Sequence, residues 1–308
     1  MRFIDKISIL LIKFFCKLDS PFLISLILII RLQEIKFINY KKNSKKKILY
    51  FRKSIGYDDL IATFDKIKSK YSVFWIPRIY FYHIFHHFLK DKLKYIHDFN
   101  YLDVKTENQK LKYRTFLKKI FLHMNNFWGL YGFFSSIFLY AYEREIQNVS
   151  KELNFPFVCI HKEGIRSKNQ RIVQDWIYSN RIGKYNGSLI VVYNENEKKS
   201  LINSKIAKSK QIVVGGCPRL DKFFKIKKSK NEDKILTCFL IQNTYGLPIY
   251  KYKWLIPNIY QNKIKPKNFT WKFLNNLYYK QIKKFAQQNK DYKVIIKSKI
   301  RVDLLNLG

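Results

Sequence analysis

The sequence predicts an α/β protein built on parallel sheets. Three β-branched runs of strand length, FVCI (157–160), SLIVVY (188–193) and QIVVG (211–215), are each followed by a turn signal. Polar, helix-like segments lie between them, at about 169–182 and 194–204. Alternation of strand and helix is typical of a parallel sheet with right-handed crossovers, in which ligands bind beyond the carboxyl ends of the strands.

Length and composition allow two ordinary domains. The chain has 308 residues, 47% of them hydrophobic, and a formal net charge of +38. Such a charge first indicates nucleic acid or anionic lipid as a partner. Lysine, isoleucine and asparagine are inflated while glycine and proline are few, however, which is typical of an AT-rich coding bias that spreads lysine over every solvated face. We therefore expect no specific nucleic-acid partner, although this surface favours polyanions and anionic membranes.

Cysteine and histidine placement predicts no metal site. The four cysteines are scattered without a CxxC pair, which argues against a disulfide framework or a zinc site and favours a reducing cytoplasm. His83, His86 and His87 have the helical spacing that can place two imidazoles on one metal, but no Asp, Glu or Cys pattern completes a site.

Residues 1–46 read as an apolar and basic arm. The apolar pieces 7–16 and 22–30 are interrupted by polar residues, and neither reaches the roughly 17–25 residues that span a bilayer. No small-residue cleavage site of the secretory type is present. A lysine cluster at 41–47 follows directly. Two interpretations remain open: the arm lies on the anionic inner face of the plasma membrane, or it packs on the protein's own core.

Residues 47–225 are expected to form a first Rossmann-like domain. No Pro/Gly/Ser-rich linker or internal repeat interrupts this part of the chain. Before the three runs described above, we predict strands at 47–51, 71–76, 93–96 and 133–140, and helices at about 60–70, 78–90, 105–124 and 141–153.

Residues 226–308 are expected to form part of a second Rossmann-like domain. A charged, apolar-poor stretch at 225–234 reads as a linker, and a strand (234–241), a helix (about 270–289) and a strand (292–297) follow. These elements are too few for a complete doubly wound domain, so we predict that the second domain is truncated.

Polar residues directly after the strand at 157–160 are the first candidates for chemistry. Alternate residues point to the same side of a strand, so His161 and Glu163 can both face one cleft, where either can act as general base toward a sugar hydroxyl. Gly164 would let an acceptor or a phosphate approach the backbone. The alternative is a capping turn with solvated charges. Arg166 and Asn194 are further candidates for substrate binding.

Other candidates follow later strands. Arg219 can donate in a fork to phosphate or carboxylate, and Asp221 can cap the next helix or hold Arg219. With Gly216 they are candidate substrate-binding residues, although we expect Arg219 and Asp221 to be mainly structural. In the second domain the candidate nucleotide-binding residues are Gln242, Thr244, Lys297 and Lys299.

The runs FLYAYEREIQNVSKELNFPFVCIHKEG, IVVYNENEKKSLI and IVVGGCPRLDKF resemble bacterial surface-polysaccharide biosynthesis proteins with a GT-B glycosyltransferase fold. More distantly, they are similar to CDP-glycerol glycerophosphotransferases and bacterial polysialyltransferases. The resemblance covers about 133–224, and the GxPRxD-like ending at 216–221 is its most specific part. HKEG stands where the relatives carry a His-Gly motif whose His is the catalytic base. This points at His161, with Glu163 as the competitor because Gly164 is not adjacent to the His.

The resemblance implies a transferase of surface-glycan synthesis. The donor would be a nucleotide-sugar or a CDP-polyol, used as substrate without a cofactor or metal, and the acceptor a glycan or lipid-linked molecule. The relatives contact the donor phosphates with a His-Pro pair, where this chain reads Ile296-Lys297-Ser298-Lys299. Two alternatives remain: a nucleotide-sugar epimerase of the same architecture, and a non-catalytic protein that binds polyanions or membranes.

Overall fold

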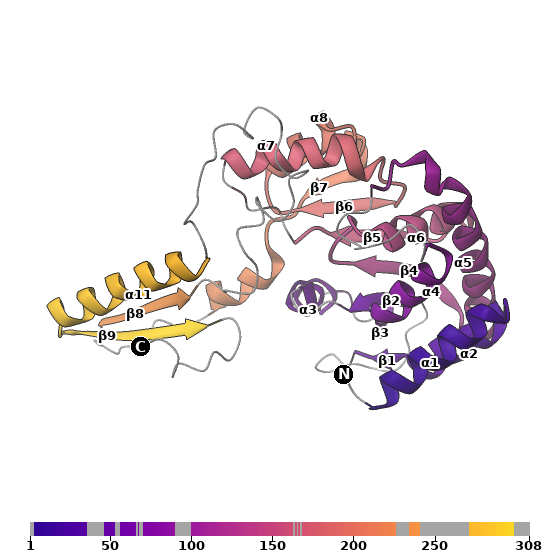
Figure 1. Cartoon of the computed structure of the whole chain (residues 1–308), viewed down its shortest axis with the longest axis horizontal. Coiled ribbons are helices and arrows are strands. Elements are labelled where there is room, and N and C mark those ends of the chain that lie inside the picture. Colours follow the sequence, from indigo (N-terminus) through magenta and orange to yellow (C-terminus); the bar gives the residue numbers. More distant parts are fainter. Residues whose placement is uncertain are drawn as a thin grey trace. The chain divides into compact units, whose positions relative to one another are not determined.

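In this computed structural model the chain forms two compact units, Met1–Lys225 and Ile226–Gly308, which we describe separately (Figure 1). The structure describes all residues except 1–2, 36–45, 53–55, 66, 68–69, 90–99, 163, 165, 167, 226–233, 241–270 and 299–308.

The first unit is built on a seven-stranded sheet with the order β1-β3-β2-β4-β5-β6-β7. All neighbouring strands are parallel except β1 and β3, which are antiparallel. The predicted α/β class with a parallel sheet is therefore confirmed, apart from this antiparallel edge. The strands are β1 (Gln33–Glu34), β2 (Lys46–Arg52), β3 (Tyr71–Pro77), β4 (Leu130–Ser135), β5 (Phe157–Ile160), β6 (Leu189–Val192) and β7 (Ile212–Val214).

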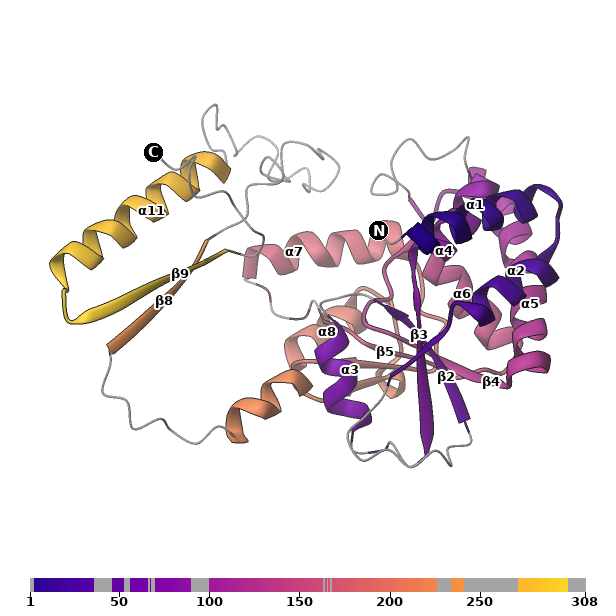
Figure 2. The same ribbon diagram turned by 90° about the horizontal axis from the view of Figure 1, so that it is seen from below.

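Helices cover both faces of this sheet because successive strand residues point to opposite sides. Phe133 joins the large core beneath α1, α2 and α4–α6, whereas Phe134 joins a smaller core beneath α3. Figure 2 shows α1, α2, α4 and α5 gathered on one side of the strands. The helices are α1 (Phe3–Lys17), α2 (Pro21–Ile30), α3 (Tyr57–Phe64), α4 (Ile79–Leu89), α5 (Glu107–Trp128), α6 (Ala141–Glu152), α7 (Lys168–Ile177) and α8 (Glu195–Asn203).

The N-terminal arm packs on the core of the first unit, as the second of its two interpretations predicts. Ile12 of α1 and Ile24 of α2 are fully buried in the large core. Arg31 binds Asp5 at 2.7 Å, and the Tyr80 hydroxyl of α4 donates to the same carboxylate oxygen at 2.9 Å. Among the described helices, none combines the length and the apolar character needed to cross a bilayer.

One predicted strand of the first unit has wrong boundaries, and one predicted helix changes type at its end, each for a local reason. The strand expected at 133–140 is β4, which begins at Leu130 because Gly129, with φ of 74°, ends α5 in the left-handed conformation. β4 ends at Ser135, whose hydroxyl donates to the Ile137 carbonyl at 2.7 Å and turns the chain. The helix expected at 169–182 is α7 followed by a π-helical turn, Tyr178–Ile182. The strand predicted at 93–96 lies outside the described residues.

The second unit contains the predicted strand, helix and strand. β8 (Lys234–Leu240) and β9 (Tyr292–Ser298) are parallel neighbours, and α11 (Trp271–Gln288) packs against both. Cys238 of β8 and Ile282 of α11 are buried between them. The Lys234 ammonium lies 2.6 Å from the Asp291 carboxylate, which joins the beginning of β8 to the residue before β9.

Candidate functional site

The candidate site lies at the carboxyl edge of the first sheet. β2 has β3 on one side and β4 on the other, so the strand order reverses at β2, and in open α/β sheets ligands bind at such a reversal. The loops after β2 and β4 meet closely there: a Cβ on Gly56 would overlap the side chain of Ser136. Only glycine allows this approach.

His161, directly after β5, is the centre of the site. Its imidazole is fully buried, and its Nε2 lies 3.1 Å from the Tyr178 hydroxyl and 3.5 Å from Glu197 Oε1. The Phe138 ring, from the loop after β4, packs against the imidazole with 4.8 Å between ring centroids. The other nitrogen, Nδ1, is buried and has no hydrogen-bond partner among the described residues.

The hydrogen bonds around Tyr178 determine where the proton of a neutral His161 sits. The Tyr178 hydroxyl has one proton, and it donates this proton to Glu197 Oε1 at 2.9 Å. Burial, together with this carboxylate, raises the pKa of Tyr178 well above its usual value, so the phenol stays protonated. Toward His161 the hydroxyl can therefore only accept. The Arg166 guanidinium also lies 3.5 Å from Nε2, but the shorter contact is the one with the hydroxyl at 3.1 Å, and from it we infer that the imidazole proton lies on Nε2. Nδ1 is left with a free lone pair.

Glu197 stays ionised although it is buried. Burial alone would raise its pKa, but the hydrogen bond to His161 and the charge and hydrogen bond of Arg166 lower it to about 2. Arg166 donates to Glu197 Oε2, while Asn194 Oδ1 accepts from the Glu197 backbone N–H at 2.9 Å. Asn194 thereby caps the start of α8, where the helix dipole also favours a negative charge. Its amide nitrogen donates to the Gly164 carbonyl at 2.9 Å.

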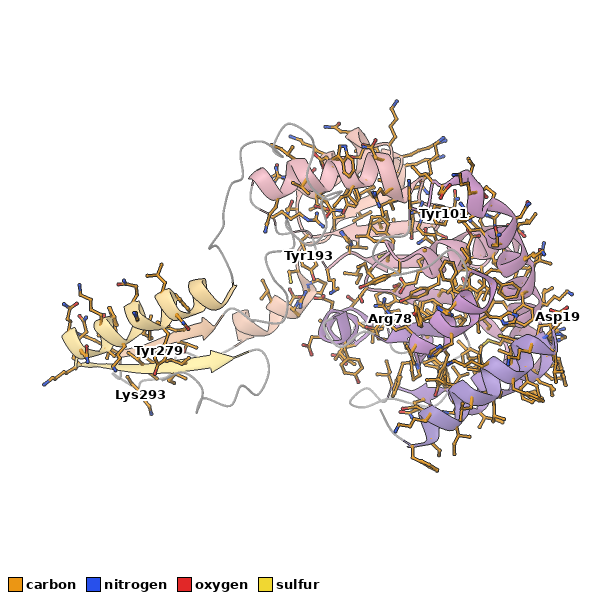
Figure 3. All side chains as sticks on the ribbon, viewed as in Figure 1. Asp19, Arg78, Tyr101, Tyr193, Tyr279 and Lys293 are labelled. Carbon is orange, nitrogen blue, oxygen red and sulfur yellow. The ribbon has the colours of Figure 1, made fainter. Side chains whose placement is uncertain are left out.

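A second network connects α3 to the ends of β6 and β7. The Tyr193 hydroxyl donates to Asp59 Oδ2 at 2.7 Å, and Arg219 lies 3.1 Å from the same oxygen (Figure 3). The Arg219 backbone N–H donates to Asp59 Oδ1 at 3.2 Å. Gly216 has φ of 69°, the left-handed conformation that turns the chain between β7 and Arg219. These contacts give Arg219 a structural role, as we expected. Its partner Asp59 was not among the predicted residues.

The structure brings His161, Gly164, Arg166 and Asn194 together as one cluster. One expectation is corrected: His161 was expected to face an open cleft, but its ring is fully buried because Phe138 and Tyr178 pack on it. Asp221 lies at an exposed position in the 3₁₀ turn Pro218–Lys225. Lys297 lies in β9, but its side chain is not among those described. Four further predicted residues lie outside the described part of the chain: Glu163, Gln242, Thr244 and Lys299.

The sequence analysis missed Tyr178, Glu197, Asp59 and Tyr193. A signal for Glu197 existed, because Asn194 followed three residues later by Glu is a typical start of a helix. Tyr178 carries no such signal, since it reaches His161 only through the π-helical turn after α7. Asp59 is 134 positions from Tyr193 in the chain, so their contact follows from the sheet order alone.

Two other features of the described residues lie away from this edge. No group of three His, Cys, Asp or Glu side chains suits a metal ion among them, and His83 with its neighbours is no exception. A surface depression of about 960 Å³ lies at the opposite edge of the sheet, before β5, β6 and β7. Its lining includes Lys205, Lys208 and Lys210 but no acidic residue and no residue of the His161 cluster.

The chain matches no protein-family model and no curated protein. The resemblance to surface-polysaccharide proteins therefore remains a prediction, and the functional argument depends on the geometry of the site.

Proposed function

We propose that this protein is a glycan transferase of GT-B-like architecture, with two Rossmann-like domains. It would transfer a sugar or a polyol phosphate from a nucleotide-activated donor to a glycan or lipid-linked acceptor. One observation carries the proposal: at the carboxyl edge of a parallel sheet, His161 is held by Tyr178 and Glu197 at Nε2, while Nδ1 is buried and has no hydrogen-bond partner in the described part of the chain.

In this proposal Nδ1 of His161 is the general base. As the acceptor hydroxyl oxygen forms its bond to the donor's reacting carbon or phosphorus, the bond to the nucleotide leaving group breaks, and the hydroxyl proton moves to Nδ1. The imidazolium that forms is stabilised through Nε2 by Glu197, which is already ionised. A carboxylate that orients an imidazole and stabilises its cation is a recurring arrangement in enzymes that activate hydroxyl groups. The buried ring requires that the acceptor displace the side chains covering it.

In the first unit, two arginines would meet negative charges of the substrate. Arg166 lies beside His161, with its side chain 10% exposed, and Arg219 lies at the end of the next strands, 27% exposed. The donor would bind the second unit through Gln242, Thr244, Lys297 and Lys299. We further propose that the reaction takes place in the cytoplasm, at the inner face of the plasma membrane, where a lipid-linked acceptor is available.

The experiment is a transfer assay with a panel of nucleotide-sugars and CDP-glycerol against a synthetic lipid-linked saccharide. Wild type is compared with His161→Gln and Glu163→Gln, with a thermal melt for each. His161→Gln should release nucleotide and transfer the sugar about 10²–10⁴-fold more slowly, as expected for loss of a general base. Wild-type turnover in His161→Gln would contradict the proposal, and loss in Glu163→Gln alone would assign the base to Glu163. If the protein converts a nucleotide-sugar to its epimer in the absence of an acceptor, its activity is epimerisation and not transfer.

A further inference from the structure

α1 presents three different surfaces around its axis. With about 100° per residue, Ile9, Ile12 and Cys16 fall on one side and pack into the core. The opposite side is apolar and exposed: Phe3 is 78% exposed, and Leu10 is 65% exposed. Its remaining members are Ile4, Ile7, Leu11, Phe14 and Leu18, all at least 40% exposed. We call these seven residues the α1 apolar face.

Exposed apolar side chains also lie on the neighbouring helices α2 and α5. Phe22 of α2 is 40% exposed and packs edge-to-face on Phe127 of α5, which is 60% exposed. Ile30, at the end of α2, is 78% exposed. Scattered exposed apolar side chains are ordinary in soluble proteins, but a contiguous set on one helix and its neighbours indicates an interaction surface.

A row of lysines borders the α1 apolar face. Lys6, Lys13 and Lys17 are exposed and recur at helical spacing beside Leu10 and Phe14. Asp5 is the acidic residue of α1, and it is turned inward to Arg31. The helix therefore has an apolar side, a cationic border and a core-facing side, which is the pattern of helices that lie in the plane of an anionic membrane surface.

We propose that the α1 apolar face docks the protein onto an anionic lipid bilayer, with Phe3, Leu10 and Phe14 in the acyl boundary and the lysine row on the headgroups. This inference does not depend on the transferase chemistry. The charge distribution favours a bilayer over a second copy of the chain. Two copies of a protein with a net charge of +38, joined through this face, would bring their lysine rows together, whereas anionic headgroups neutralise them.

Because the helix is fixed before it meets lipid, docking needs no coupled folding. α1 is held by the buried side chains of its inner face and by the Asp5 contacts with Arg31 and Tyr80. We therefore expect the far-ultraviolet circular dichroism of the protein to change little on binding vesicles. A Phe14→Trp variant should show a blue-shifted emission on binding.

The test is co-sedimentation of the full chain with vesicles of phosphatidylcholine alone or mixed with phosphatidylglycerol. Leu10→Ser with Phe14→Ser should abolish binding to both, and both side chains are exposed, so the fold should persist. Replacing Lys6, Lys13 and Lys17 by Gln should weaken binding to the anionic vesicles about 100-fold, at about fivefold per lysine. The matched control replaces Lys205, Lys208 and Lys210, which line the depression at the strands' opposite edge, and should bind much more like wild type.

Two results would overturn the proposal. The first is unchanged vesicle binding of the Leu10→Ser/Phe14→Ser variant, or equal losses for the two lysine triples. The second is a concentration-dependent dimer in sedimentation velocity that the serine variant abolishes, because a second copy would then cover the face. Vesicle binding that is lost in the serine variant while transfer to a soluble acceptor persists would separate this inference from the proposed function.

Discussion

Two buried carboxylates of the first unit have nearly the same surroundings, but only one of them lies beside a group that a substrate can use. Glu197 and Glu145 are 2% and 0% exposed, and each is bound by an arginine and by a tyrosine hydroxyl. The partners are Arg166 and Tyr178 for Glu197, and Arg114 and Tyr101 for Glu145.

The fourth member of each cluster makes the difference. Beside Glu145 it is Asn148, whose amide nitrogen donates to Tyr101 and Glu145 and whose oxygen accepts from Asn186 at 2.7 Å. Beside Glu197 it is His161, whose Nδ1 has no partner among the described residues. A buried polar network with every group satisfied makes the fold rigid, whereas an unsatisfied basic nitrogen is a group that a substrate can use.

The largest expected difference is in activity. His161→Gln should lower transfer by about 10²–10⁴, whereas Asn148→Ala should leave transfer per folded molecule unchanged. The measurement is turnover normalised to the folded fraction from a thermal melt. Equal losses of transfer activity in both variants would mean that both clusters have only a structural role.

Stability should respond in the same way at both carboxylates. Glu197→Gln and Glu145→Gln each remove the counter-charge of a partly buried arginine, so each should lower the free energy of unfolding by about 2 kcal/mol, less than for a fully buried pair. Denaturant titration of both variants measures this. A loss below about 1 kcal/mol at Glu197 alone would show that this carboxylate is not part of the buried network described above.

Acid should act on the Glu197 cluster in a defined range. The pKa of Glu197 is lowered from 4.5 to about 2 in the folded protein, so the unfolded chain binds the proton more readily. The carboxylate's contribution to stability is therefore complete above pH 4.5 and is lost as the pH falls toward 2. Comparing the melting temperatures of wild type and Glu197→Gln over this range tests the sign. The two curves should converge at low pH, and parallel curves would contradict the assignment.

The smallest expected difference is between the variants of the two tyrosines, Tyr178 and Tyr101. Tyr178→Phe and Tyr101→Phe each remove one buried hydroxyl, at a cost of roughly 1 kcal/mol in unfolding free energy. Tyr178→Phe should also slow transfer, because the hydroxyl fixes the proton of His161 on Nε2, while Tyr101→Phe should not. Steady-state rates of the pair decide this.

From the sequence, the positions of the strand ends could be predicted better than the side-chain contacts beyond those ends. The runs at 157–160 and 188–193 are almost the observed β5 and β6, since buried parallel strands are continuous apolar runs. The same pattern predicts that the candidate site lies at their carboxyl ends. The pairings of His161 with Glu197 and of Arg219 with Asp59 depend on sheet order and side-chain packing over long separations, which periodicity does not encode. Likewise, the apolar pieces of the arm could not show which side of α1 packs inward.

The most direct measurement is the tautomer of His161 by nitrogen-15 NMR of histidine-labelled protein near neutral pH. We predict that the neutral form of the ring carries its proton on Nε2 and not on Nδ1, and that this preference is lost in Tyr178→Phe. A neutral ring protonated at Nδ1 would contradict it, because the nitrogen assigned as the base would then have no lone pair to accept the acceptor's proton.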